Sequence, residues 1–295
     1  MKIAITGSSG MIGSALCPRL ETAGHQIIRI RNRHVKNPNG EWSPSNQWIR
    51  DGVLEGVDVV LHLAGASIGD KRWSNTYKEE MRVSRIDGAR LLVETIRNMT
   101  NRPKAFITSS AVGFYGDRAD EKLNEQSSRG NGFLADLVND WETEAHAAEE
   151  LGLRVAMVRS GVVLRSMLPV LITPFKFGLG GKLGNGKQYF PWIGLEDLVR
   201  IYETTVTGDL TGPINAVAPQ AATNAEFTKA LGRVIKRPTL FPLPGFMLEL
   251  IMGGEKAQET GLVSQRVVPQ RLIDSDWQFT HTTIEQALPE ELAAL

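Results

Sequence analysis

The stretch MKIAITGSSGMIG, residues 1–13, decides the fold. Residues 2–6 form a short apolar run with several β-branched side chains, which predicts a strand. The segment MIGSALCPRLETAG, residues 11–24, carries apolar residues at helical spacing and ends on a glycine, which predicts a helix. The turn between them has the spacing G-x-x-G-x-x-G, formed by Gly7, Gly10 and Gly13.

This glycine turn predicts a dinucleotide site. A backbone approaches a pyrophosphate closely only where there is no Cβ, and a helix N-terminus presents unpaired N–H groups and a partial positive charge to that anion. The alternative is an ordinary strand-to-helix turn, but the strand directly before and the helix directly after favour the dinucleotide. The other residues assigned to this part of the site are Ser9, Met11 and Ile12.

Strand-like and helix-like runs alternate through the first 160 residues, which is typical of βαβ crossovers and a parallel sheet. We therefore expect an α/β fold, a Rossmann-type doubly wound parallel sheet with a smaller C-terminal substrate lobe. The expected division is a dinucleotide-binding domain at 1–163, completed by part of 192–220, and a lobe at 164–295. Further strands are expected in HQIIRIR, VDVVLHLAG, KAFITSS and RVAMVRSG.

Composition excludes several other classes of protein. The 33 basic and 33 acidic side chains cancel, so no global field favours nucleic acid or an anionic membrane as a partner. Cys17 is the single cysteine, which excludes an intrachain disulfide and favours a reducing, cytoplasmic location. The early glycines interrupt any secretory signal, and no apolar run approaches the ~20 residues of a spanning helix. The histidines lack ligand spacing, so no metal site is expected.

The end of the second strand indicates which dinucleotide binds. An acidic residue there binds the adenosine ribose 2′-hydroxyl of NAD, whereas a basic residue accommodates the 2′-phosphate of NADP. Residues 29–33 read RIRNR, with Arg31 and Asn32 as the best candidates, Arg33 beside them and no acid in reach, which favours NADP(H) over the alternative of a solvated basic edge.

The segment HLAG, residues 62–65, lies at the carboxyl end of a strand, where open α/β sheets bind ligands. Ala64 and Gly65 are assigned to the cofactor site because small residues let the adenosine side pass closely, and the adjoining Leu63 is assigned with them. His62 is interpreted as a half-buried strand residue.

These motifs together resemble the atypical, extended branch of the short-chain dehydrogenase/reductase superfamily, and over nearly the whole chain they are similar to the epimerase family protein group. The resemblance implies a Rossmann domain that binds NADP(H). By position in the family motif W-x6-E-x4-R after Trp73, it also implies Glu80 and Arg85 near the cofactor, and the predicted site includes Ser109 and Val163. The resemblance rests on DKRW, SRIDGARLL, SSAVGFYGD, VRSGVVL, PFKFGLGG, TNAEFTKALGR and SQRVVPQR.

The catalytic set of the superfamily is incomplete in this chain. Its usual Tyr-x-x-x-Lys helix, aligned here on Glu142, has Leu134 and Val138 in place of the two proton-transferring groups. The usual serine position holds Ala111. We therefore name Ser110, one position upstream, and Tyr115, in the loop beyond the strand, as catalytic candidates; the alternative for each is a structural role.

The substrate motif also departs from the family. Extended members carry Gly-x-Gly-x-Gln-x-Arg, whose arginine clamps the diphosphate of a sugar nucleotide, whereas GNGKQYF, residues 184–190, ends on Phe190. The segment around it predicts an apolar, aromatic wall. The leading hypothesis is an NADP(H)-dependent oxidoreductase that acts on a small carbonyl or alcohol. The alternatives are a non-catalytic NADP(H) sensor or protein-interaction module, and a nucleotide-sugar epimerase; a homodimer is an option for each.

Overall fold

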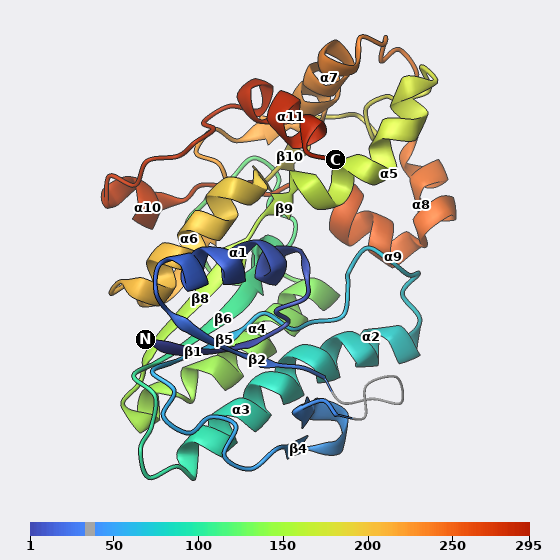
Figure 1. Ribbon diagram of the computed structural model, residues 1–295. Coiled ribbons are helices and arrows are strands. Elements are labelled where there is room, and N and C mark those ends of the chain that lie inside the picture. Colours follow the sequence, from blue (N-terminus) through green and yellow to red (C-terminus); the bar gives the residue numbers. More distant parts are fainter. Residues whose placement is uncertain (33–38) are drawn as a thin grey trace. The chain divides into compact units, whose positions relative to one another are not determined.

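A six-stranded sheet forms the centre of the computed structural model, which describes residues 1–32 and 39–295 (Figure 1). The strand order is β12-β8-β6-β5-β1-β2, and the pairs β2–β1, β1–β5 and β5–β6 are parallel. The predicted Rossmann-type doubly wound sheet is confirmed. The strands are β1 (Lys2–Thr6), β2 (Gln26–Ile30), β5 (Val59–His62), β6 (Ala105–Ala111), β8 (Arg154–Ser160) and β12 (Gly212–Ala216).

The chain reverses its direction of winding between β1 and β5, because β2 lies on one side of β1 and the later strands lie on the other. Open α/β sheets bind ligands at the carboxyl ends of the strands beside this switch point. Ile3 pairs with Val59 and Thr6 with His62, so the glycine turn after β1 and the HLAG segment after β5 emerge side by side.

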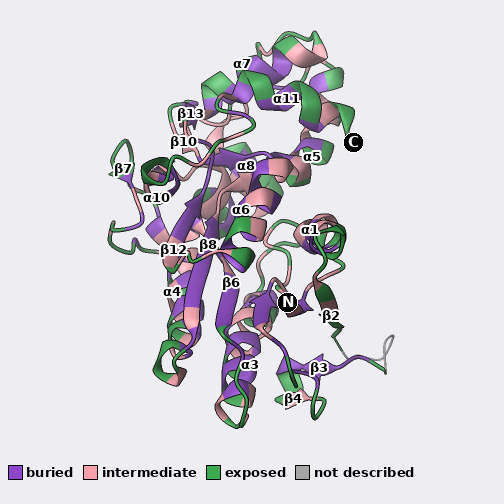
Figure 2. Cartoon of the chain, turned by 60° about the vertical axis from the view of Figure 1, so that its left-hand side comes forward, coloured by how far each residue is buried: buried purple, intermediate pink, exposed green. Residues whose placement is uncertain are grey.

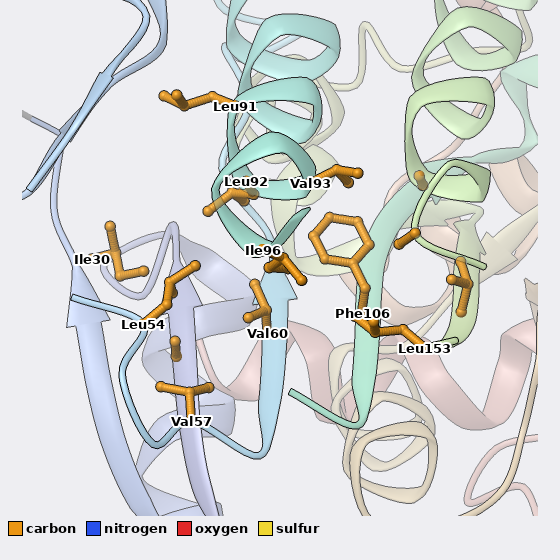
Figure 3. Close-up of a cluster of buried hydrophobic side chains, with 14 of the residues drawn as sticks. Ile30, Leu54, Val57, Val60, Leu91, Leu92, Val93, Ile96, Phe106 and Leu153 are labelled. Carbon is orange, nitrogen blue, oxygen red and sulfur yellow. The ribbon is translucent and has the colours of Figure 1, made fainter. Parts of the chain in front are cut away.

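The central strands are buried because helices cover both faces of a doubly wound sheet. In Figure 2 most of β6 and β8 is drawn in the colour of buried residues. A cluster of apolar side chains from β5, β6 and α3 fills the space beside the sheet (Figure 3), among them Val60, Leu92, Ile96 and Phe106.

Contacts between residues divide the chain into two compact units that interleave along the sequence. Unit 1 comprises residues 1–110, 137–158 and 199–213, and unit 2 comprises 111–136, 159–198 and 214–295. The predicted division at 163 and 164 stays a prediction about which residues serve the cofactor and which serve the substrate.

The helices of unit 1 follow from its amphipathic segments. The helices α2 and α3 are joined by a π-helical turn, η2 (Val83–Asp87), so that 75–97 is one helical run with an irregular centre. A short hairpin of β3 (Trp42–Ser43) and β4 (Trp48–Ile49) follows β2 in the described chain. Three helices lie wholly in this unit, α1 (Met11–Thr22), α2 (Asn75–Arg82) and α3 (Gly88–Arg97), and two that begin in unit 2 end in it, α4 (Phe133–His146) and α6 (Leu195–Thr207).

Unit 2 has its own apolar core, formed by Leu168, Trp192, Phe227 and Leu288 among others. Capping boxes fix the starts of α7 and α11, where Thr223 pairs with Glu226 and Thr283 with Gln286. Its helices are α5 (Leu164–Lys176), α7 (Asn224–Ile235), α8 (Gly245–Met252), α9 (Gly254–Lys256), α10 (Gln270–Asp274) and α11 (Ile284–Ala293). Its short strands are β7 (Lys122–Leu123), β9 (Val162–Val163), β10 (Tyr189–Phe190), β11 (Trp192–Ile193), β13 (Ala222–Thr223) and β14 (Arg266–Val267).

Across the described residues, every helix is too short or too polar to span a bilayer.

Candidate cofactor and catalytic site

The glycine turn is closed so tightly that two of its glycines have no room for a side chain. Gly7 has a φ of +69°, and a Cβ there would lie 2.7 Å from the backbone nitrogen of Ala64. A Cβ on Gly13 would lie 2.5 Å from the carbonyl oxygen of Gly7. Gly10 donates its N–H to the same oxygen at 3.0 Å. The turn after β1 therefore packs backbone against backbone, both within itself and against the HLAG segment.

The helix that follows the turn begins without a side-chain cap. Gly10 is the N-cap residue of α1, no side chain accepts a hydrogen bond there, and the first turn holds no acid. Ser9 and Gly10 are exposed, and Met11 and Ile12 are partly exposed. The first N–H groups of α1 and the positive end of its dipole thus face outward, an arrangement that binds an anion.

Arg85 is a cation that contacts the HLAG segment at this end of the sheet. A Cβ on Gly65 would lie 2.9 Å from the Cζ of Arg85, so glycine lets the guanidinium rest on the backbone after β5. Arg85 lies in the π-helical turn η2, a type of irregularity found often at functional sites. Burial lowers the pKa of Arg85 to about 10.

Within the described chain, the guanidinium of Arg85 has no carboxylate partner. It donates to the carbonyl of Met81 at 3.4 Å and lies 5.4 Å from the ring centre of Trp141. A partly buried cation without an anion is costly, and an anionic ligand would compensate it. Arg85 is therefore the clearest sign of a ligand in unit 1.

Arg31 has an acidic partner that the sequence analysis did not find. Its Nη2 donates to Glu41 Oε1 at 2.9 Å, its Nε to Oε2 at 3.3 Å, and its backbone N–H to Oε2 at 2.9 Å. The statement that no acid lies in reach of the second strand was wrong, because the β3 hairpin returns Glu41 to the end of β2. Asn32 is exposed and bridges to Trp42, and Arg33 lies outside the described residues.

The ionic hydrogen bonds between Arg31 and Glu41 shift the pKa of both side chains. The Arg31 guanidinium holds the pKa of Glu41 below its usual range, and Glu41 raises the pKa of Arg31. Glu41 is 5% exposed, whereas the Arg31 side chain is 60% exposed.

His62 and Glu80 take opposite environments. His62 is fully buried rather than half-buried, since its ring contacts Thr6 at 2.8 Å and stacks edge-on with Trp42 and Trp141. Burial lowers its pKa to about 4, so the ring is neutral. Glu80 is exposed on α2 and pairs with Lys71 at 3.4 Å.

The two serines at the end of β6 both have partners inside unit 1. The Ser110 hydroxyl donates to Glu142 at 2.5 Å, and both residues are buried. Ser109 contacts the hydroxyl of Tyr202 at 2.7 Å. Glu142, used in the sequence analysis only to set a register, is thus the acceptor for the proposed catalytic hydroxyl.

Tyr115 and Val163 lie in unit 2. The Tyr115 side chain is fully buried; its hydroxyl donates to Asn215 at 2.7 Å and accepts from Arg159 at 3.0 Å. Burial raises the pKa of Tyr115. A hydroxyl with both hydrogen bonds made and no exposed surface has a structural role in this conformation, and its catalytic assignment gains no support. Val163 is a buried residue of β9.

The positions that usually hold tyrosine and lysine are apolar in space as well as in sequence. Leu134, in the first turn of α4, donates its backbone N–H to Glu259 at 2.7 Å, and Phe133 does the same at 2.8 Å. Val138 is buried. The Glu259 carboxylate therefore caps the start of α4 at Leu134, the position of the usual catalytic tyrosine.

The aromatic segment around Phe190 belongs to the core of unit 2. Phe190 lies 5.0 Å from the ring of Phe227, and Tyr189 lies under the guanidinium of Arg266 at 5.0 Å. Phe190 thus fills space in the position of the diphosphate-clamping arginine. The described residues hold no cluster of metal-binding side chains.

Comparisons with known proteins give consistent matches. The family model described as NAD dependent epimerase/dehydratase family matches residues 3–214, and a domain of unknown function, DUF1731, matches 243–291. The epimerase family protein Mb2239 of Mycobacterium bovis is 40% identical over 291 residues, covering 97% of this chain and 96% of the relative.

Two solved structures are similar over the whole of this chain. The human epimerase family protein SDR39U1, crystallised with NADPH, has a TM-score of 0.89 at 30% identity and is itself covered completely. A nucleoside-diphosphate sugar epimerase from Corynebacterium glutamicum has a TM-score of 0.80 at 36% identity, with 58% of its chain covered. The resemblance read from the motifs is confirmed.

Proposed function

The chain belongs to the NAD dependent epimerase/dehydratase family, and from this premise we propose that it binds NADP(H) and transfers hydride to or from a small, partly apolar carbonyl or alcohol. The observation that supports the cofactor is the combination of the backbone-packed glycine turn, the uncapped start of α1 and Arg85, which has no carboxylate partner in the described chain.

These groups suit a dinucleotide in three different ways. Gly7 and Gly13 keep the turn free of side chains, the N–H groups of α1 offer donors for the pyrophosphate, and Arg85 supplies a cation with no competing carboxylate in the described chain. Arg31 is the candidate for the 2′-phosphate. The solved human relative was crystallised with NADPH, which supports the same cofactor here. The nicotinamide of a bound NADP(H) would supply or accept the hydride.

The remaining cofactor assignments are proposals of lower rank. Leu63 and Ala64 follow β5 and pack against the glycine turn, so their backbone suits the adenosine side. Ser109, with its hydroxyl on Tyr202, and Val163, in unit 2, are proposed from the resemblance. Glu80 faces solvent beside Lys71, so we propose that it acts on the cofactor through its charge and not by direct contact.

A partly apolar substrate is favoured over a sugar nucleotide. Phe190 packs on Phe227 in place of the clamping arginine, so a diphosphate loses its bidentate partner. Unit 2 also exposes large apolar side chains from one helix, with Phe246, Leu250 and Ile251 of α8 each more than 60% exposed. Such surfaces mark the places where proteins bind apolar ligands or partners.

Ser110 is the first candidate for the catalytic hydroxyl, and Tyr115 the second. Ser110 is the last residue but one of β6, near the carboxyl edge of the sheet, and its bond to Glu142 gives its proton a defined acceptor. Tyr115 would have to leave the bonds to Arg159 and Asn215 before it could reach a substrate.

A non-catalytic NADP(H) sensor is the second candidate function. The observation that favours it is the internal satisfaction of both candidate hydroxyls, together with Leu134 and Val138 in the positions of the usual acid and lysine. A sensor would bind NADP+ and NADPH with different affinities and without turnover. A nucleotide-sugar epimerase ranks third because of Phe190.

The first experiment is calorimetric titration of the protein with NADPH, NADP+, NADH and NAD+. We expect NADPH and NADP+, which carry the 2′-phosphate, to bind more tightly than NADH and NAD+. Binding by none of them would refute the proposal. Turnover with a panel of small carbonyls then distinguishes an oxidoreductase from a sensor, and titration with nucleoside diphosphate sugars tests the epimerase.

A cytoplasmic location is part of the proposal, because Cys17 is the single cysteine of the sequence and is a buried, free thiol. A homodimer is proposed only as the common assembly of the extended members that the sequence resembles.

A further inference from the structure

An acidic and a basic side chain, Glu41 and Arg31, lie together at the end of β2, where a dinucleotide fold recognises the adenosine ribose. The backbone places Glu41 there: its N–H donates to the carbonyl of Arg31 at 2.8 Å, and its carboxylate accepts the N–H of Arg31 at 2.9 Å. These two bonds hold the carboxylate at the strand end whatever side chain occupies position 31. The Arg31 guanidinium then covers it with its Nε and Nη2 edge.

Each of these groups recognises a different ligand. A carboxylate at this strand end binds the 2′-hydroxyl of NAD, and an arginine accommodates the 2′-phosphate of NADP. In this chain the carboxylate is buried under the arginine, whose side chain is 60% exposed. Glu41 takes the Nε and Nη2 edge of the guanidinium, so within the described residues Nη1 is left for a phosphate.

We propose that Glu41 is a ribose-hydroxyl acceptor that Arg31 keeps closed, so that this ion pair determines the preference for the 2′-phosphate. The inference rests on the proposed binding of NADP(H). Arg31 thus has two effects: it attracts the phosphate, and it withholds from NAD(H) the carboxylate that would bind the ribose.

Removal of the Arg31 side chain would expose the Glu41 carboxylate and leave the backbone hydrogen bonds that hold Glu41 in place. Glu41 would keep the backbone N–H of residue 31, and Arg50 lies 3.9 Å away as a second cation. Because Glu41 is only 5% exposed and loses its guanidinium partner, we expect some loss of stability, which thermal unfolding measures.

The test is calorimetry with NADPH and NADH on four proteins: the unchanged chain, Arg31→Ala, Arg31→Ala combined with Glu41→Gln, and Arg29→Ala. Arg29 is the matched control, because it lies on the same strand and pairs at 2.7 Å with Glu21 rather than Glu41. We expect Arg31→Ala to weaken NADPH binding by roughly 10–100-fold, as loss of a charged hydrogen bond does, and to tighten NADH binding several-fold. Arg29→Ala should change the NADPH to NADH ratio by less than about two-fold, because the charge is exposed and screened.

The double variant decides whether Glu41 is the acceptor. The gain in NADH affinity should disappear in it, because glutamine offers one neutral oxygen in place of the carboxylate. If Arg31→Ala weakens NADPH and NADH equally, or if the double variant keeps the gain for NADH, the inference is overturned while NADP(H) binding stands. If the unchanged chain binds neither dinucleotide, the proposed function fails first and the inference with it. Thermal unfolding of each variant confirms that the fold is retained.

Discussion

The substitution Arg85→Met separates a ligand-binding cation from a structural one. Methionine keeps an unbranched apolar stem beside Trp141 and removes the charge. If Arg85 serves an anionic ligand, its desolvated charge destabilises the free protein, and the bound anion compensates this charge. The variant should therefore lose dinucleotide affinity and keep or gain stability.

The structure sets the size of both effects. The fall in the Arg85 pKa from 12.5 to about 10 corresponds to roughly 3 kcal/mol against the charged form in the free protein. Because the side chain is only partly buried, and its cation–π contact with Trp141 offsets ~0.5–1 kcal/mol, we expect a net gain of about 1 kcal/mol in unfolding free energy. The loss of a charged hydrogen bond to a phosphate predicts NADPH binding weaker by ~10–100-fold.

Urea unfolding of the free protein and calorimetry with NADPH measure the two quantities. Arg82→Met is the control, because Arg82 lies one helical turn earlier and pairs with Asp140 at 2.7 Å. It should cost at most about 1 kcal/mol of stability and leave NADPH affinity unchanged. A large loss of stability in Arg85→Met with unchanged NADPH affinity would show that Arg85 is structural, and the reasoning would be refuted.

Three further predictions test the neighbouring features. Gly13→Ala should weaken NADPH binding in calorimetry and cost ~1–3 kcal/mol in urea unfolding, because its Cβ would lie 2.5 Å from the carbonyl of Gly7; unchanged affinity would contradict the role of the turn. Because His62 is buried and neutral, the unfolded chain takes up its proton first, and the free energy of unfolding should fall by up to about 3 kcal/mol as pH falls from 6.5 towards 4. Urea titrations at several pH values should show that His62→Gln removes this pH dependence. Tyr115→Phe should cost ~1–3 kcal/mol by breaking bonds to Arg159 and Asn215; full stability with abolished turnover would instead favour a catalytic Tyr115.

The fold was predictable because its signals are local. The strand, turn and helix of residues 1–24 appear as the periodicity required, and β1 pairs with β5 and β2 as a doubly wound sheet demands. The requirement for Gly7 and Gly13 also follows from the spacing alone, since the turn must fold back on itself. Interleaving of the two units could not be predicted, because it depends on contacts between segments that are not adjacent in the sequence.

The site was less predictable wherever a partner comes from a distant segment. Glu41 has no local signal: it lies 10 residues after Arg31 in the sequence, and only the paired backbone of the two residues reveals the contact. The partners of Ser110 and Tyr115, Glu142 and Asn215, lie 32 and 100 residues away. Residue type and spacing therefore identify a candidate hydroxyl, but its availability depends on tertiary contacts.

The groups proposed for the cofactor and the catalytic candidates differ in how completely their polar atoms are satisfied. On the cofactor side, α1 starts uncapped and Arg85 lacks a carboxylate in the described chain, so an anion would complete it. On the catalytic side, Ser110 and Tyr115 already have close, buried partners. A bound dinucleotide is therefore compatible with both a reductase and a sensor, and titrations with NADPH alone do not separate them. The difference depends on whether Ser110 can exchange its bond to Glu142 for one to a substrate. Substitution Ser110→Ala in a turnover assay is accordingly the sharper test: an oxidoreductase that uses this hydroxyl should lose turnover while NADPH affinity stays unchanged.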